Sequence, residues 1–141
     1  QTRWEDWVPG PGVDIAPDDR VYGRVDTDHT ADVRIGRITG AMSTLADRIR
    51  GTVSAPWIGE QVEVEVGCHP WIWPLEAPNR DDTVFPDGQD TYYCSWNPVT
   101  EWDVQKEQDL AVSYDEPGGD RVYAVFRITA QVYLPLVVRN H

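Results

Sequence analysis

The chain has 141 residues, a formal net charge of −12 and 40% hydrophobic residues. This length fits one domain with its own core and is too short for a TIM barrel or for a two-domain enzyme. The hydrophobic content excludes a disordered chain, no apolar run is long enough to span a membrane, and the negative charge disfavours nucleic acids and anionic lipid surfaces as partners.

Residues 1–17 are expected to form an extended arm, because they contain Trp4, Trp7 and a Pro-Gly-Pro-Gly run but no alternating pattern. Beyond them, apolar and polar residues alternate in short runs, which is typical of β-strands with one buried face. The clearest run is 61–66, where valines alternate with polar residues. We expect strands at 21–25, 33–38, 48–54, 61–66, 92–96, 110–114 and 122–128, with 131–138 as a candidate last strand.

Helical periodicity is nearly missing from the sequence. Residues 41–49 are the one candidate, and they would form two turns at most or simply a hairpin connection. Turn-forming residues separate the strands, notably the Pro-Gly-Gly run within 116–120. A parallel α/β fold is excluded because it needs crossover helices. The pattern therefore predicts an all-β protein, an antiparallel β-sandwich of seven or eight strands over residues 18–141.

Cys68 and Cys94 are the two cysteines of the chain. Their spacing lacks the CxxC pattern of metal and redox sites, so we expect one disulfide, with two buried thiols in a cytosolic protein as the alternative. Such a bridge stabilises the fold by about 3.5 kcal/mol in the loop-entropy model. The cysteines bracket residues 67–90, predicted to be a long insertion whose base the bridge would hold.

The beginning of the chain favours export. It starts with Gln1 rather than Met, which is what the removal of a signal peptide would leave. Together with the expected disulfide, this predicts an extracellular or cell-surface location.

Catalytic motifs find little support. There is no GxSxG elbow, and His29, His69 and His141 are scattered along the chain. A dyad of Cys68 with His69 is disfavoured, because neighbours on a strand point to opposite faces. With 24 acidic residues, some pair would match a glycosidase by chance. We predict that the protein is not an enzyme, and a small secreted hydrolase is kept as a third hypothesis.

One acidic segment has ligands that suit a hard cation. Carboxylates at Asp81, Asp82, Asp87 and Asp90 are of the type that Ca²⁺ prefers. They do not follow the EF-hand pattern, and a solvated acidic loop is the favoured interpretation. We expect no cofactor apart from this candidate Ca²⁺ site.

Tryptophan is the strongest compositional signal, with seven in the chain. Trp71 and Trp73 would share a face of an extended segment. With Trp102 they are a candidate platform for stacking a polysaccharide, and loop packing or contact with another subunit are the alternatives. Packing in the core is favoured for Trp57, Trp96 and Trp102. Trp4 and Trp7 are candidates for intermolecular docking, because a free arm with two exposed indoles would aggregate.

The C-terminal segment is apolar at successive positions, unlike a strand with one wet face. Such a strand needs cover on both sides, and Pro135 restricts it to an edge or to one-sided pairing. It can complete its own sheet or add to the sheet of a neighbour. Its candidate contact residues are Val132, Tyr133, Leu134, Leu136 and Val137.

Two stretches resemble known proteins. Residues 50–56 with 59–66, RGTVSAP followed by GEQVEVEV, resemble the rhythm of bacterial immunoglobulin-like surface domains. The tail VYLPLVVRN at 132–140 is similar to a tail on secreted proteins of some filamentous, often thermophilic, bacteria. The resemblance implies an exported, surface-associated immunoglobulin-like β-sandwich and carries over no catalytic residues.

These features lead to two functional hypotheses. In the first, the protein is a structural subunit of an extracellular filament or surface assembly, a homopolymer joined through its N-terminal arm, its C-terminal strand at 131–141, or both. In the second, it is a secreted carbohydrate-binding module that uses the tryptophan platform.

Overall fold

A computed structural model describes residues 16–24, 30–71, 77–88 and 90–128 of the chain. These residues form ten strands and no helix, so the predicted all-β class is confirmed. The strands are β1 (Arg20–Arg24), β2 (Thr30–Arg34), β3 (Arg37–Ile38), β4 (Ala41–Ser43), β5 (Arg48–Ser54), β6 (Val64–Trp71), β7 (Arg80–Val84), β8 (Thr91–Ser95), β9 (Asp109–Asp115) and β10 (Arg121–Arg127).

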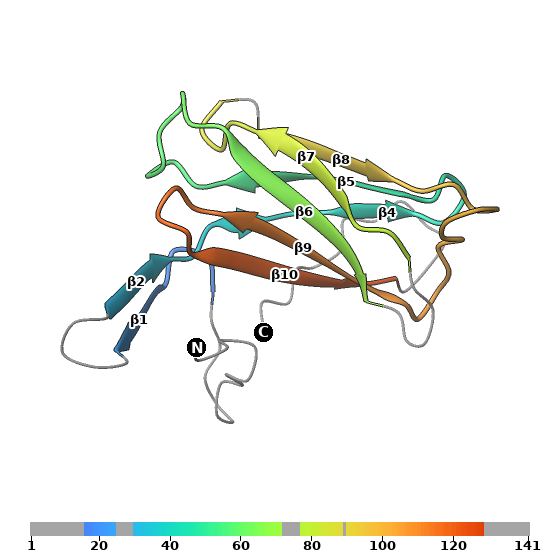
Figure 1. Ribbon diagram of the computed structural model, residues 1–141, viewed down its shortest axis with the longest axis horizontal. Coiled ribbons are helices and arrows are strands. Elements are labelled where there is room, and N and C mark those ends of the chain that lie inside the picture. Colours follow the sequence, from blue (N-terminus) through green and yellow to red (C-terminus); the bar gives the residue numbers. More distant parts are fainter. Residues whose placement is uncertain (1–15, 25–29, 72–76, 89, 129–141) are drawn as a thin grey trace.

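Eight of these strands form two antiparallel sheets packed face to face (Figure 1). One sheet has the order β10-β9-β6-β7, and in the other β5 lies between β8 and the pair β3 and β4. The two layers follow the arrangement of immunoglobulin-like domains, in which strands A, B and E face strands C, F and G. Here A is the pair β3–β4, B is β5 and E is β8, while C is β6, F is β9 and G is β10. The fourth strand, β7, lies beside β6. The predicted sandwich is therefore confirmed.

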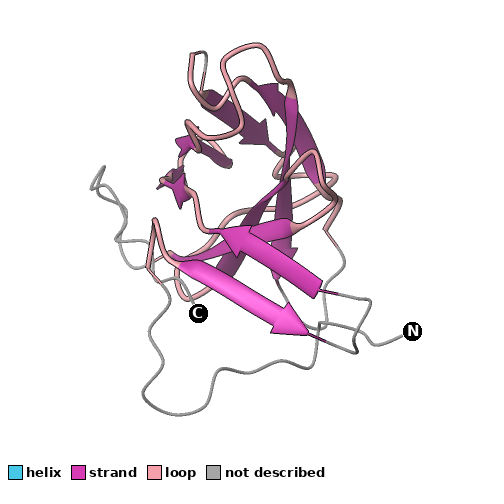
Figure 2. Ribbon diagram, turned by 90° about the vertical axis from the view of Figure 1, so that its left-hand side faces the viewer, coloured by secondary structure: helices cyan, strands magenta, loops and turns pink. Residues whose placement is uncertain are grey.

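The strands β1 and β2 form a separate hairpin that projects from one end of the sandwich (Figures 1 and 2). Its base is attached at Gly36, whose N–H donates a 3.0 Å hydrogen bond to the Tyr114 hydroxyl. A Cβ at this glycine would lie 2.4 Å from that oxygen, so a larger residue would displace it. The Arg34 guanidinium lies 4.6 Å from the ring centroid of Trp57, which gives the hairpin a second attachment through a cation–π contact.

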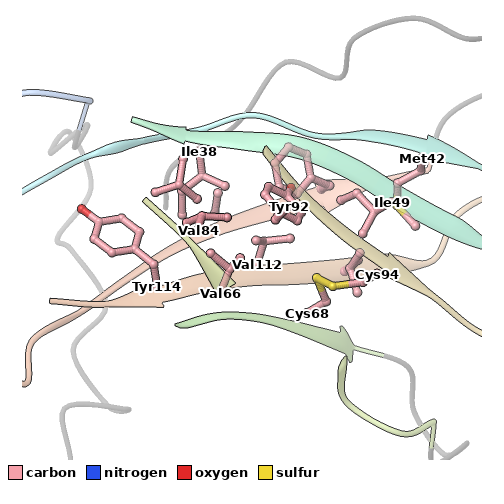
Figure 3. Packing of buried hydrophobic residues seen from close by; sticks show 14 of the residues in the cluster. Ile38, Met42, Ile49, Val66, Cys68, Val84, Tyr92, Cys94, Val112 and Tyr114 are labelled. Carbon is pink, nitrogen blue, oxygen red and sulfur yellow. A yellow bond between two sulfur atoms is a disulfide. The ribbon is translucent and has the colours of Figure 1, made fainter. Parts of the chain in front are cut away.

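The core lies between the two sheets, and the bridge between Cys68 and Cys94 crosses it (Figure 3). Val64 and Val66 of the alternating run point into this core, while Glu65 is exposed, as the alternation predicts. The predicted disulfide is confirmed, and it joins β6 of one sheet to β8 of the other. Residues 67–90, which the sequence suggested as a long insertion, contain the end of β6 and all of β7.

Residues 41–49 form a hairpin rather than a helix. Strand β4 ends at Ser43, β5 begins at Arg48, and Met42 lies opposite Ile49 in the buried face. Leu45 completes a helix-like apolar spacing in the sequence, but it lies in the turn and is 75% exposed. Pairing with the rest of the sheet therefore outweighs a two-turn local pattern, because short helices are only marginally stable.

Strands β3 and β4 are two halves of one edge strand, since both keep the same register against β5. The bend between them occurs at Thr39. Its carbonyl accepts a 2.6 Å hydrogen bond from the Tyr92 hydroxyl, and its Oγ1 accepts the N–H of Thr52 at 2.9 Å. A Cβ on Gly51 would lie 1.9 Å from the Thr39 carbonyl oxygen. The bend therefore requires glycine at position 51.

This contact predicts that Gly51→Ala destabilises the fold by about 1–3 kcal/mol, the usual cost of forcing extra volume into a packed site. The free energy of unfolding from denaturant titration measures the effect. Gly118→Ala is the matched control, because a Cβ there meets nothing within 4 Å, and it should change stability by no more than about 0.5 kcal/mol. Equal effects of the two substitutions would contradict this account of the bend.

Candidate assembly edge and aromatic face

A two-sheet sandwich has four edge strands, which here are β7, β8, β10 and the bent strand β3–β4. An edge strand presents backbone N–H and C=O groups that another chain can pair with, and natural proteins block such edges. The way in which each edge is blocked decides where this sandwich can accept another strand.

The strands β7 and β8 block each other on one side of the sandwich, where they lie in contact (Figure 1). The N–H of Tyr93 on β8 donates to the Asp82 carboxylate at 2.7 Å. The carbonyl of Ser95 accepts a 3.1 Å hydrogen bond from Arg80 Nε. Side chains of β7 thus occupy backbone groups that β8 would otherwise offer to a neighbour.

The loop after β8 strengthens this closed side. The Glu101 carboxylate accepts the N–H of Asn97 at 2.9 Å and forms an ion pair with Arg80. The hydrogen bond from Asn97 and then the Arg80 guanidinium lower the pKa of Glu101. One carboxylate therefore fastens the loop to β7.

Trp96 and Trp102 lie in the core beneath the same loop. Their rings meet edge to face with centroids 4.8 Å apart. The indole N–H of Trp96 donates to the Pro78 carbonyl at 2.7 Å, and that of Trp102 donates to Gln108 Oε1 at 3.0 Å. Both side chains are buried, as favoured for the core. The platform role suggested for Trp102 is not compatible with this position, because the ring has no open face.

The bent strand β3–β4 is blocked by its own shape. Its two halves have only two and three residues, and the bend at Thr39 separates them. The Thr39 carbonyl is already bonded to Tyr92. Short and bent edge strands are poor templates for a further strand.

Strand β10 differs from the other three edges. All seven of its residues pair with β9 without a bulge. It contains no proline, glycine or inward-pointing charge, and its inward residues are Val122, Ala124 and Phe126, which are buried. Within the part of the chain that the structure describes, no strand pairs with its other side. A long, regular edge of this kind is a template for strand addition.

The hydrogen-bonding pattern shows which residues of β10 face this free side. The N–H of Ile128 donates to the Gln108 carbonyl, and the N–H of Glu116 donates to the Asp120 carbonyl. Because pairing alternates along an antiparallel ladder, even-numbered residues of β10 face β9. The backbone groups on the free side therefore belong to Arg121, Tyr123, Val125 and Arg127.

The two terminal arginines of β10 do not shield this side. Arg127 binds both carboxylate oxygens of Asp109 on β9, at 2.8 and 3.0 Å. Arg121 binds Asp115 of β9 in the same two-point manner, and this hydrogen bond lowers the pKa of that carboxyl. Both guanidinium groups are thereby drawn across the sheet towards β9, away from the free side.

The outer face of the sheet β10-β9-β6-β7 carries two exposed aromatic side chains, and we name it the aromatic face. Trp71 at the end of β6 is 67% exposed, and Tyr123 on β10 is 50% exposed. From strand spacing and rise they lie about 10 Å apart across the sheet and about 14 Å apart along it. Ala111 of β9 occupies the position between them. Trp73 lies outside the described residues.

His69 also lies on the aromatic face, next to the inward-pointing Cys68. Its Nε2 is 2.9 Å from the Oγ of Ser113, which is buried. A Cβ on Gly67 would lie 2.5 Å from this nitrogen, so glycine makes room for the ring. The expected opposite orientation of Cys68 and His69 is confirmed, which excludes their dyad.

The four aspartates suggested as a Ca²⁺ site lie on β7 and in the turn that follows it. Asp81 and Asp82 are in the strand, and Asp87 and Asp90 lie between β7 and β8. The carboxylate of Asp82 is taken by the backbone N–H groups of Thr83 and Tyr93. Over the described ranges, no three His, Cys, Asp or Glu residues form a group suited to a metal ion.

The assembly residues suggested by the sequence lie outside the described residues. These are Trp4 and Trp7 of the arm and Val132, Tyr133, Leu134, Leu136 and Val137 of the C-terminal segment. Sequence reasoning missed the free edge of β10. The Asp residues at both ends of one predicted strand and the Arg residues at both ends of the next indicate only that these two strands pair.

Comparison of the chain with protein-family models, with curated proteins and with solved structures gives no match. Nothing in residues 16–24, 30–71, 77–88 and 90–128 forms a helix long and apolar enough to cross a membrane.

The contacts of Glu101 predict an acid-sensitive component of stability. Because its folded-state pKa is lowered, its stabilising effect is present above the unfolded pKa of about 4.3 and is lost as the pH falls through the folded pKa. The free energy of unfolding should therefore fall more between neutral pH and about pH 3 in the wild type than in Glu101→Gln. Glu60→Gln, at an exposed loop residue, is the matched control and should follow the wild type. Identical pH profiles for all three proteins would refute this role.

Proposed function

We propose that the protein is a structural subunit of an extracellular assembly in which a strand from one copy adds to the free side of β10 in another. The observation that carries this proposal is the contrast between β10 and the other edges. Three of the four edges are blocked by side chains or by a bend, whereas β10 is regular over seven residues.

Two further features support the proposal. The disulfide ties the two sheets together, and structural disulfides are typical of proteins that fold outside the cytosol. An interface between a terminal strand and a distant edge joins two different surfaces. Such a contact does not close on itself unless its rotation forms a ring, so it propagates as a filament.

The proposal predicts that the full-length protein, purified without denaturant, forms long regular filaments in negative-stain electron microscopy. Light scattering after size-exclusion chromatography should show masses far above the 16.0 kDa of one chain. The reason is that each copy carries one edge and one terminal segment, so addition can continue. A monodisperse species of 16.0 kDa at all concentrations would overturn the proposal.

The aromatic face favours a second candidate function, the binding of a polysaccharide. An exposed tryptophan and tyrosine on one sheet face offer apolar rings with polar edges, which suits stacking on sugar rings. Trp71 lies opposite Asp109 in the register, so a charged hydrogen-bonding group is present beside the indole.

This candidate predicts that a soluble polysaccharide quenches tryptophan fluorescence of the wild type and that Trp71→Ala weakens the binding by about tenfold, as for an interface hot spot. Leu45→Ala is the matched control, because Leu45 is also a large, exposed apolar side chain but lies in the β4–β5 turn. If the polysaccharide affinities of both variants equal that of the wild type, Trp71 is not a binding residue.

A further inference from the structure

We infer that residues 131–138 of a second copy are the strand that β10 accepts, in a register set by Pro135. This inference rests on the proposed function and names the two partners of its interface. The acceptor is the free side of β10, which the backbone groups of Arg121, Tyr123, Val125 and Arg127 form.

The composition of the segment fits this edge. Residues 131–138, QVYLPLVV, contain no charge and no glycine, and these eight residues are enough to cover the seven residues of β10. Copies of a chain with a net charge of −12 repel each other. An uncharged strand adds nothing to this repulsion, and the arginines at both ends of β10 are already neutralised by Asp109 and Asp115.

The connection after β10 argues against pairing of the segment with its own β10. Both backbone groups of Ile128 still bond to the chain that leads into β9, because its N–H donates to the Gln108 carbonyl and its carbonyl accepts the Glu107 N–H. A return along the same strand would therefore need a tight turn at residues 129–130. Such turns require positive φ angles and use Gly, Asn or Asp. Residues 128–139 contain none of these, and Thr129 is β-branched.

Pro135 decides which residues of the added strand face β10. It has no N–H, so it fits only where its backbone points away from the acceptor. Because backbone groups alternate along a strand, Val132, Leu134, Leu136 and Val138 then face β10. These four residues meet the four residues of the free side. The proline also leaves a gap in the new outer edge, which hinders a further strand from adding there.

Two proline variants of the full-length chain test the inference by blocking one partner each. Val125→Pro removes a free-side N–H of β10 without removing a hydrogen bond to β9. Leu134→Pro removes an N–H that faces the acceptor in the inferred register. Each variant alone should stay at 16.0 kDa. An equimolar mixture should form a species of twice that mass and no filaments, because one intact segment meets one intact edge.

Matched controls separate this register from a general effect of proline. Tyr133→Pro places the ring on the side that faces away, as Pro135 does, and should assemble like the wild type. Near-UV circular dichroism checks that Val125→Pro is folded. If Val125→Pro is not folded, Tyr123→Pro takes its place in the experiment, because it removes another free-side N–H of β10.

The outcomes distinguish this inference from the proposed function. If Val125→Pro alone assembles like the wild type, β10 is not the acceptor, and both the inference and the proposed function are overturned. If Leu134→Pro assembles like the wild type and Val125→Pro does not, the inference is overturned while the proposed function stands. This result includes the case in which the N-terminal arm is the added strand. If the wild type itself is a monomer, the proposed function fails and the inference fails with it.

Discussion

The requirement that backbone N–H and C=O groups find partners is the constraint on which the rest of this structure depends. In a sandwich this requirement is hardest to meet at the edges, and the chain meets it in three different ways. Asp82 and Arg80 bond to the backbone of a neighbouring strand, Thr39 turns its carbonyl towards Tyr92, and β7 and β8 lie against each other. The remaining edge, β10, is regular, and no strand of the described residues pairs with its outer side.

Two buried tyrosines hold the beginning and the bend of the bent strand in place. Tyr114 comes from the opposite sheet and accepts the N–H of Gly36, and Tyr92 donates to the carbonyl of Thr39. Burial raises the pKa of both phenols, so both stay protonated over the physiological range. Each hydroxyl needs a nearby glycine, Gly36 for Tyr114 and Gly51 for Thr39 and Tyr92. The core therefore combines apolar packing with polar contacts that specify how the edge strand bends.

Period-two alternation was enough to predict most strands and the fold class, because burial of one face is a local property of the sequence. The pairing of Cys68 with Cys94 was equally predictable, since no other cysteine competes. The strand β7 was not predicted, because RDDTV is polar and becomes a strand only by pairing with β6. The free edge of β10 depends on contacts between residues far apart in the chain, which local patterns do not contain.

The bridge between the sheets also has a mechanical consequence. If the protein is pulled at its ends, the chain between the two cysteines, which are 26 positions apart, cannot be drawn out while the disulfide is intact. An extended chain spans about 3.4 Å per residue. Roughly 90 Å of contour length therefore stays within the disulfide-closed loop when the oxidised protein is stretched. Oxidised subunits joined in series would therefore lengthen less under load than reduced ones, and the cysteine pair limits the extensibility of a fibre made from them.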